Sequence, residues 1–125
     1  MTRVLIVDDD PDIRASLGVV LRAAGYETLT AADGAQGLAC IYAEHIDVLV
    51  IDVFMPERDG IETIAEVRRE CPRLKVIAMS GGGDRRKRAD YLEVARQIGA
   101  DSTLSKPFDA SRLLVALRDV IGASR

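Results

Sequence analysis

The sequence predicts an α/β fold in which helices cover both faces of a parallel sheet. Short apolar runs rich in β-branched residues recur along the 125 residues, and after each run the apolar residues recur with helical spacing. This alternation repeats five times, which predicts a (βα)5 pattern. Because crossovers between parallel strands are right-handed, such a chain closes as a three-layer sandwich. We expect a single domain over residues 1–125, without an effector domain.

The predicted strands differ in how continuous their apolar character is. The first strand, Arg3 to Val7, contains VLIV and the third, Asp47 to Ile51, contains VLVI. Consecutive apolar residues are typical of strands that are covered on both faces. We therefore place these two strands at the centre of the sheet, in the flavodoxin-like order 2-1-3-4-5. The other predicted strands are Tyr26 to Thr30, Lys75 to Met79 and, more weakly, Ser102 to Leu104.

Capping residues and glycines mark where the helices begin and end. Before the first helix, Asp10 can act as the N-cap and Pro11 as the first helical residue. Gly25 is expected to end this helix. Apolar stripes that begin at Ile61, Tyr91 and Leu113 predict three later helices, with Gly60, Gly99 and Gly122 as boundary marks.

Composition and charge argue against several functional classes. The chain has 17 basic and 20 acidic residues, so it lacks the basic excess that nucleic-acid binding favours, and we expect no direct DNA binding. The longest apolar run, Leu38 to Ala43, is too short to cross a membrane, and the acidic N-terminal segment does not resemble a secretory signal. A cytoplasmic location is therefore expected. Cys40 and Cys71 lack metal-binding spacing and are interpreted as reduced packing residues. The lone histidine, His45, is interpreted as a surface or packing residue, not as a phosphotransfer site, so a kinase is not expected.

Acidic residues follow the predicted strands at their carboxyl ends, where open parallel sheets bind ligands. Asp8 and Asp9 follow the first strand and Asp52 follows the third, so adjacent strands would bring these carboxylates together. Like charges at short range repel unless a cation lies between them. Mg²⁺ suits such a site best, with Mn²⁺ as an alternative, because it binds one or two carboxylates and leaves positions for phosphate oxygens. Asp10 is assigned to helix capping instead.

Ser80 and Lys106 follow the fourth and fifth strands at the same edge of the sheet. Either residue alone is a weak signal, because a serine at a strand end and a solvated lysine are both common. Their presence together with Asp52 is the informative observation. The step from Lys106 to Pro107 also invites a cis peptide bond, which would fix the direction of the lysine.

The ordered set of motifs resembles the receiver domain of two-component response regulators. The motifs are V-D-D after the first strand, D-x-x-M-P-x-x-D-G from Asp52 to Gly60, Ser80, and K-P-F from Lys106. The resemblance covers the whole chain and implies a CheY-like response regulator of the stand-alone type. The roles that it implies are Mg²⁺ binding by Asp8, Asp9, Asp52 and the backbone carbonyl of Phe54, phosphoryl acceptance by Asp52, pairing of Lys106 with the phosphoryl group, and switching by the hydroxyl of Ser80.

Chemistry supports these implied roles, because a carboxylate can attack a phosphoryl group when the charge on the phosphoryl oxygens is neutralised. The resemblance implies a histidine kinase or a histidine phosphotransfer protein as phosphodonor. It also implies an output protein that reads the face formed by the fourth helix, the fifth strand and the fifth helix. Phosphorylation would act by shifting a two-state equilibrium of that face. A monomer and a phosphorylation-dependent dimer both remain open, and the chain is not expected to be an enzyme.

The chain departs from the receiver pattern in its switch region. Thr103 stands where many receivers have a tyrosine or phenylalanine that swings inward on activation. Gly81, Gly82 and Gly83 follow the fourth strand, and glycines permit backbone conformations that are closed to other residues. We therefore expect this loop to act as the hinge.

Four consecutive cations, Arg85, Arg86, Lys87 and Arg88, follow this loop. A solvated surface turn is the simpler interpretation. The other is a patch that docks an acidic partner or stabilises the phosphorylated loop. The sequence leaves both interpretations open.

Three other functions fit the residues less well than the receiver hypothesis does. A haloacid dehalogenase-type phosphatase would use Asp8 as nucleophile and Asp10 as general acid, but Asp12 departs from its motif and no later acidic pair is found beyond Asp109. A flavin mononucleotide binder needs a phosphate loop after the first strand, whereas DDDPD would repel a phosphate. An interaction module with a vestigial pocket is disfavoured, because the expected pocket residues are present.

Overall fold

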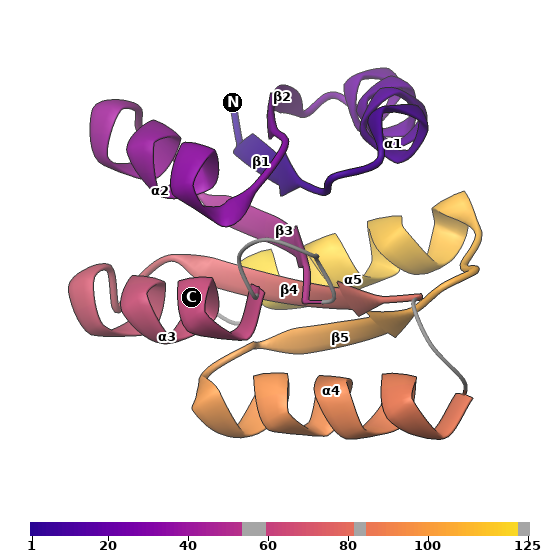
Figure 1. Ribbon diagram of the computed structural model, residues 1–125. Helices are drawn as coiled ribbons and strands as arrows, with labels where there is room; N and C mark the ends of the chain where they lie inside the picture. The colour runs from indigo at the N-terminus through magenta and orange to yellow at the C-terminus, as the bar shows by residue number, and fades with distance from the viewer. Residues whose placement is uncertain (54–59, 82–84, 123–125) are drawn as a thin grey trace.

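The computed structural model describes residues 1–53, 60–81 and 85–122, apart from the side chains of Arg85, Lys87 and Arg88 (Figure 1). Five strands and five helices alternate along these residues. The strands are β1 Arg3–Val7, β2 Glu27–Ala31, β3 Val48–Asp52, β4 Lys75–Ser80 and β5 Ser102–Ser105. The helices are α1 Pro11–Ala23, α2 Gly34–Ala43, α3 Gly60–Glu70, α4 Arg85–Ile98 and α5 Ala110–Gly122. Among these described helices, none is both long and apolar enough to cross a membrane.

The strands form one parallel sheet in the order β2-β1-β3-β4-β5. The predicted fold class and strand order are therefore confirmed. In this order β1 and β3 lie side by side, with Val7 paired to Ile51. The residues that follow these two strands consequently emerge at the same edge of the sheet.

Helices cover both faces of the sheet, and each face has its own apolar core (Figure 1). In β1, Leu5 and Val7 belong to the core beneath α2, α3 and α4, whereas Val4 and Ile6 belong to the core beneath α1 and α5. Successive side chains of a strand point to opposite faces, so a strand between two cores must be apolar at every position. This explains the continuous apolar runs in the sequence.

Strands β2 to β5 differ from the predicted ranges by one residue at one or both ends. Each of them extends one residue further than predicted, because the added residues still pair with their neighbours, as Asp52 does with Met79 and Ser80 with Ser105. β2 and β3 also begin one residue later than predicted. For β2 the reason is that the N–H of Tyr26 donates to the carbonyl oxygen of Leu21 at 3.0 Å, which closes the end of α1.

The first helix begins and ends as predicted. Asp10 is its N-cap, and the Asp10 carboxylate accepts the N–H of Asp12 at 2.9 Å. Pro11 occupies the first helical position. Gly25 follows the helix with φ of 95°, a left-handed conformation that glycine adopts without strain. These local signals fix where the acidic segment ends and α1 starts.

Candidate functional site

Three carboxylates meet at the carboxyl ends of β1 and β3. Asp52 is the last residue of β3 and is 5% exposed, and Asp8 follows β1 and is fully buried. Asp9 is exposed beside them. One carboxylate oxygen from each of the three lies within 4.8 Å of the others. The convergence that the sequence predicted is therefore present in the structure.

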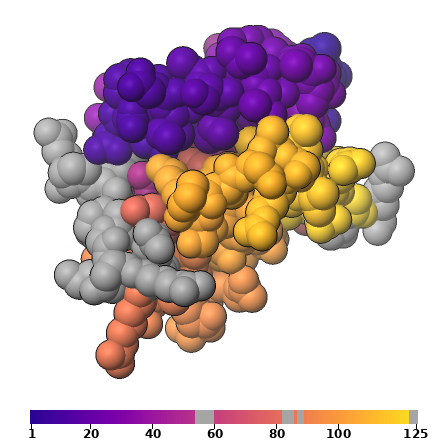
Figure 2. All heavy atoms as spheres, turned by 90° about the vertical axis from the view of Figure 1, so that its right-hand side faces the viewer, coloured from indigo at the N-terminus to yellow at the C-terminus, as the bar shows by residue number. Residues whose placement is uncertain are grey.

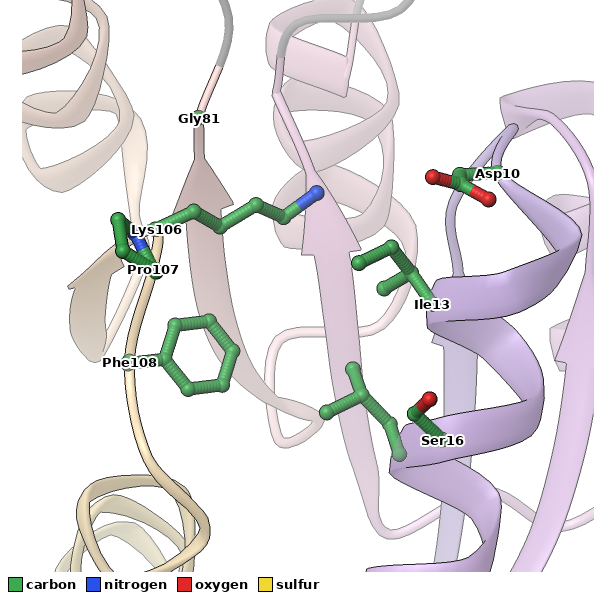
Figure 3. A pocket seen from close by; sticks show the side chains of 8 residues that line it. Asp10, Ile13, Ser16, Gly81, Lys106, Pro107 and Phe108 are labelled. Atoms are coloured by element: carbon green, nitrogen blue, oxygen red, sulfur yellow. The ribbon is translucent and has the colours of Figure 1, made fainter.

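Lys106 lies across this cluster. Its Nζ atom is 2.7 Å from Oδ2 of Asp8 and 3.3 Å from Oδ2 of Asp52. Figure 3 shows the side chain running from the loop after β5, across the end of β4, towards β3. One lysine thus pairs with two buried carboxylates that come from different strands.

The charge of Lys106 is stabilised by these partners. Burial by itself would lower the pKa of Lys106, because desolvation disfavours a charged group. The hydrogen bond that Lys106 donates to Asp8 and the negative charges of Asp52 and Asp8 outweigh burial, so the pKa of Lys106 is raised above its ordinary value. The ammonium of Lys106 therefore stays charged at neutral pH.

Ser80 is the last residue of β4 and is fully buried. Its carbonyl oxygen accepts the N–H of Lys106 at 2.9 Å, which ties the end of β4 to the segment that carries the lysine. Its side-chain Oγ atom has no hydrogen-bond partner among the described residues. A buried hydroxyl without a partner is uncommon, and it is able to donate to a ligand in the site.

Two glycines allow neighbouring segments to pack closely against Asp52 and Lys106. A Cβ atom on Gly60, at the start of α3, would collide with the backbone carbonyl of Asp52. A Cβ atom on Gly81 would lie 2.6 Å from both Cβ and Cδ of Lys106. Close packing at these two positions therefore leaves little freedom to the end of β3 and to the stem of the lysine.

A pocket of about 500 Å³ opens beside Lys106, between α1 and the loop that follows β5 (Figure 3). Its walls include Ile13 and Leu17 of α1 and the ring of Phe108. The peptide bond between Lys106 and Pro107 is cis, as the Lys-Pro step indicated. Figure 2 shows this side of the molecule, where the N-terminal segments in indigo lie beside α5 in yellow.

Arg14 is a site residue that the sequence analysis missed. Its Nη1 atom donates to the backbone carbonyl of Asp8 at 2.7 Å. The carboxylate of Asp8 in turn accepts the N–H of Asp10 at 3.0 Å. A hydrogen bond from a side chain to a main-chain carbonyl has no motif in the sequence, so only the structure reveals it.

Thr103 lies in β5 and is half-buried. Its Oγ1 atom accepts a hydrogen bond of 2.8 Å from Arg96 of α4. Several expectations fall outside the described residues: the backbone carbonyl of Phe54, the glycines Gly82 and Gly83, and the side chains of Arg85, Lys87 and Arg88. Arg86 of the same basic run is exposed.

A carboxylate cluster beside one lysine, at the carboxyl edge of a sheet of order 2-1-3-4-5, is the arrangement of a CheY-like signalling fold. A family model described as "Response regulator receiver domain" matches residues 4–118. The chain therefore belongs to the response regulator receiver domain family. Receiver domains bind Mg²⁺ at an acidic pocket and take a phosphoryl group from histidine kinases.

Individual relatives agree with this assignment. The chain is 36% identical over 119 residues to the "Probable transcriptional regulator ycf27" of Cyanophora paradoxa, and the match covers 95% of this chain and 48% of the relative. It therefore spans about half the length of that relative. Because that relative is described as a transcriptional regulator, the expectation that this chain does not bind DNA directly stays a prediction.

Solved structures match over nearly the whole chain. Chemotaxis protein CheY4 of Vibrio cholerae is 34% identical, with a TM-score of 0.84, and the match covers 96% of this chain and 98% of CheY4. Response regulator TrrA of Thermotoga maritima, solved in complex with Mg²⁺-BeF, is 29% identical, with a TM-score of 0.83 and coverage of 96% and 99%.

Proposed function

We propose that this chain accepts a phosphoryl group on Asp52 in a two-component phosphorelay and passes the signal to a partner protein. The observation that carries the proposal is the placement of Asp52, within 3.3 Å of the Lys106 ammonium and in a cluster with Asp8 and Asp9. A histidine kinase or a histidine phosphotransfer protein is the phosphodonor. That the chain signals as a single domain stays a prediction, because the relative from Cyanophora paradoxa is about twice as long as the part that matches this chain.

The donor set of the cluster fits Mg²⁺ or Mn²⁺. Asp8, Asp9 and Asp52 supply hard carboxylate oxygens within 4.8 Å of one another, and such cations prefer oxygen ligands. The backbone carbonyl of Phe54 is proposed as a further ligand. When bound, the ion would neutralise negative charge on the phosphoryl oxygens and on the cluster. TrrA, which is similar to this chain over nearly its whole length, was solved with Mg²⁺ and BeF.

The reaction that we propose at Asp52 is a simple displacement. An Oδ atom of Asp52 forms a bond to phosphorus while the bond between phosphorus and the donor's leaving group breaks, so the phosphoryl group is transferred intact. Lys106 pairs with the new phosphoryl oxygens, for which its raised pKa keeps it charged. The hydroxyl of Ser80, which has no hydrogen-bond partner among the described residues, donates to the same group.

We propose that the output leaves through the face formed by α4, β5 and α5. Ser80 is bonded through its carbonyl to Lys106, so a change at the site acts on the ends of both β4 and β5. The hinge is assigned to the glycines that begin with Gly81. On the output face, a groove of about 330 Å³ lies between β5 and α5 and is lined in part by Leu104 and Val115. A monomer and a phosphorylation-dependent dimer both fit this proposal.

Mass spectrometry after incubation with MgCl₂ and acetyl phosphate tests the assignment. We expect a Mg²⁺-dependent gain of one phosphoryl group that maps to Asp52 and is absent from Asp52→Asn. Asp9→Asn should reduce the gain, whereas Asp12→Asn, an exposed residue in the first turn of α1, is the matched control and should not. A phosphoryl group on Asp8 would instead support the phosphatase hypothesis. A protein that binds Mg²⁺ and stays unmodified by acetyl phosphate and by histidine donors would contradict the proposal.

A further inference from the structure

The backbone of Asp8 and Asp9 is held by a residue that is not part of the carboxylate cluster. Arg14, in the second turn of α1, donates from Nη1 to the carbonyl oxygen of Asp8 at 2.7 Å. Its own backbone N–H donates to the carbonyl oxygen of Asp10 at 3.1 Å. Arg14 therefore contacts the acidic segment at two main-chain positions.

The Asp8 carbonyl belongs to the peptide plane that joins Asp8 to Asp9. Rotation of this plane would turn the backbone of Asp9 and change where its carboxylate lies. The other polar groups of Asp8 are also fixed: its N–H donates to Ala31 at 3.2 Å, and its carboxylate accepts from Asp10 and Lys106. Asp9 directly follows Asp8 and is exposed. The orientation of the peptide plane that Arg14 holds therefore determines the direction in which the Asp9 side chain leaves the backbone.

We infer that Arg14 is a positioning residue for the divalent cation: it fixes the Asp8–Asp9 peptide plane so that the carboxylates converge. This inference rests on the proposed function of the cluster. Residues that hold metal ligands in place are commonly worth 10- to 100-fold in metal affinity, even though they do not touch the ion. The role of Arg14 is thus to raise the affinity of the site for Mg²⁺.

The direction in which Mg²⁺ affinity changes when Arg14 is removed distinguishes a positioning role from a purely electrostatic one. Arg14 is a cation near a cation site, so by electrostatics alone its removal would tighten Mg²⁺ binding. If Arg14 positions the carboxylates, its removal weakens binding instead. The two roles therefore predict opposite changes in the same measured constant.

Isothermal titration with MgCl₂ tests the inference on the full chain. We expect Arg14→Met to bind Mg²⁺ about tenfold more weakly than wild type or worse. Arg22→Met is the matched control, because it removes the same charge from the same helix and the Arg22 side chain donates to Thr28 instead. We expect this control to bind as wild type does. Arg14→Lys retains a donor and should recover part of the lost affinity.

The outcomes distinguish this inference from the proposed function. Equal or tighter Mg²⁺ binding by Arg14→Met would overturn the positioning role while leaving the cluster intact. An Arg14→Lys protein as weak as Arg14→Met would also overturn it, since the loss would then come from packing. Absence of Mg²⁺ binding by wild type would overturn both the positioning role of Arg14 and the proposed cation site. Mass spectrometry of Asp52 phosphorylation would test the phosphoacceptor assignment independently.

Discussion

Gly81 sets how closely the end of β4 approaches Lys106. Because a Cβ atom at this position would lie 2.6 Å from two carbons of the lysine stem, Gly81→Ala must push the stem aside. The ammonium would then move relative to Asp52. A misplacement of about 1 Å can cost about 100-fold in rate, so we expect Gly81→Ala to slow phosphorylation of Asp52 by about tenfold or more. The rate of mass gain with acetyl phosphate measures this effect.

Gly122→Ala provides the matched control at the residue scale. A Cβ atom on Gly122 would meet no described residue within 4 Å, so this variant should be phosphorylated at the wild-type rate. If Gly81→Ala also reacts at the wild-type rate, the present position of Lys106 is not needed for the reaction.

At the scale of elements, Thr103 links β5 to α4. Arg96 of α4 donates to its Oγ1 atom at 2.8 Å. Thr103→Val keeps the shape of the side chain and removes the acceptor. We expect a loss of about 0.5 to 1.5 kcal/mol in the free energy of unfolding and faster amide hydrogen exchange in α4. Urea unfolding and hydrogen-exchange mass spectrometry would measure the two changes.

Ser102→Ala is the control for this link, because Ser102 lies next to Thr103 and its side chain points to the other face of the strand. It should leave exchange in α4 unchanged. Unaltered exchange in Thr103→Val would mean that the hydrogen bond does not hold α4 against β5. The proposed signal from the site to α4 would then pass through the loop after β4 and not through this hydrogen bond.

At the scale of the whole molecule, the proposed binding of a divalent cation at the carboxylate cluster would couple folding to the concentration of that cation. An ion that binds only the folded state stabilises it by an amount that grows with its concentration, about 2.7 kcal/mol at 100 times the dissociation constant. We therefore expect MgCl₂ to raise the urea midpoint of unfolding and EDTA to reverse the increase. The shift should be smaller in Asp9→Asn, since Asp9 supplies one of the three clustered carboxylates.

Sodium chloride at matched ionic strength is the necessary control, because salt screens repulsion among carboxylates whatever the cation. An equal rise in sodium chloride would mean that screening, not binding, stabilises the fold.

The strand pattern predicted most of the architecture. Consecutive apolar residues predicted that β1 and β3 are central strands, and the adjacency of these strands predicted that Asp8 lies beside Asp52. This inference works because the carboxyl ends of neighbouring parallel strands share one edge. Strand ends were less predictable: Tyr26 has a residue type that suits a strand, yet its N–H closes α1 instead.

The hydrogen-bond and ion-pair partners of the site side chains could not be predicted from the sequence. The motif assigned Lys106 to the phosphoryl group, whereas the structure pairs its ammonium more closely with Asp8 than with Asp52. The role of Arg14 could not be predicted, because its hydrogen-bond acceptor is a backbone carbonyl and every residue has one. Such contacts depend on tertiary geometry, and residue types alone do not encode them in a readable pattern.

The buried hydroxyl of Ser80 has a consequence for stability. Among the described residues it has no hydrogen-bond partner, and a buried polar group in that condition costs about 1 to 3 kcal/mol. For the stability of the unphosphorylated fold alone, alanine would therefore suit this position better than serine. In the proposed function, a phosphoryl group on Asp52 would supply the missing partner and so stabilise the phosphorylated form relative to the unphosphorylated one.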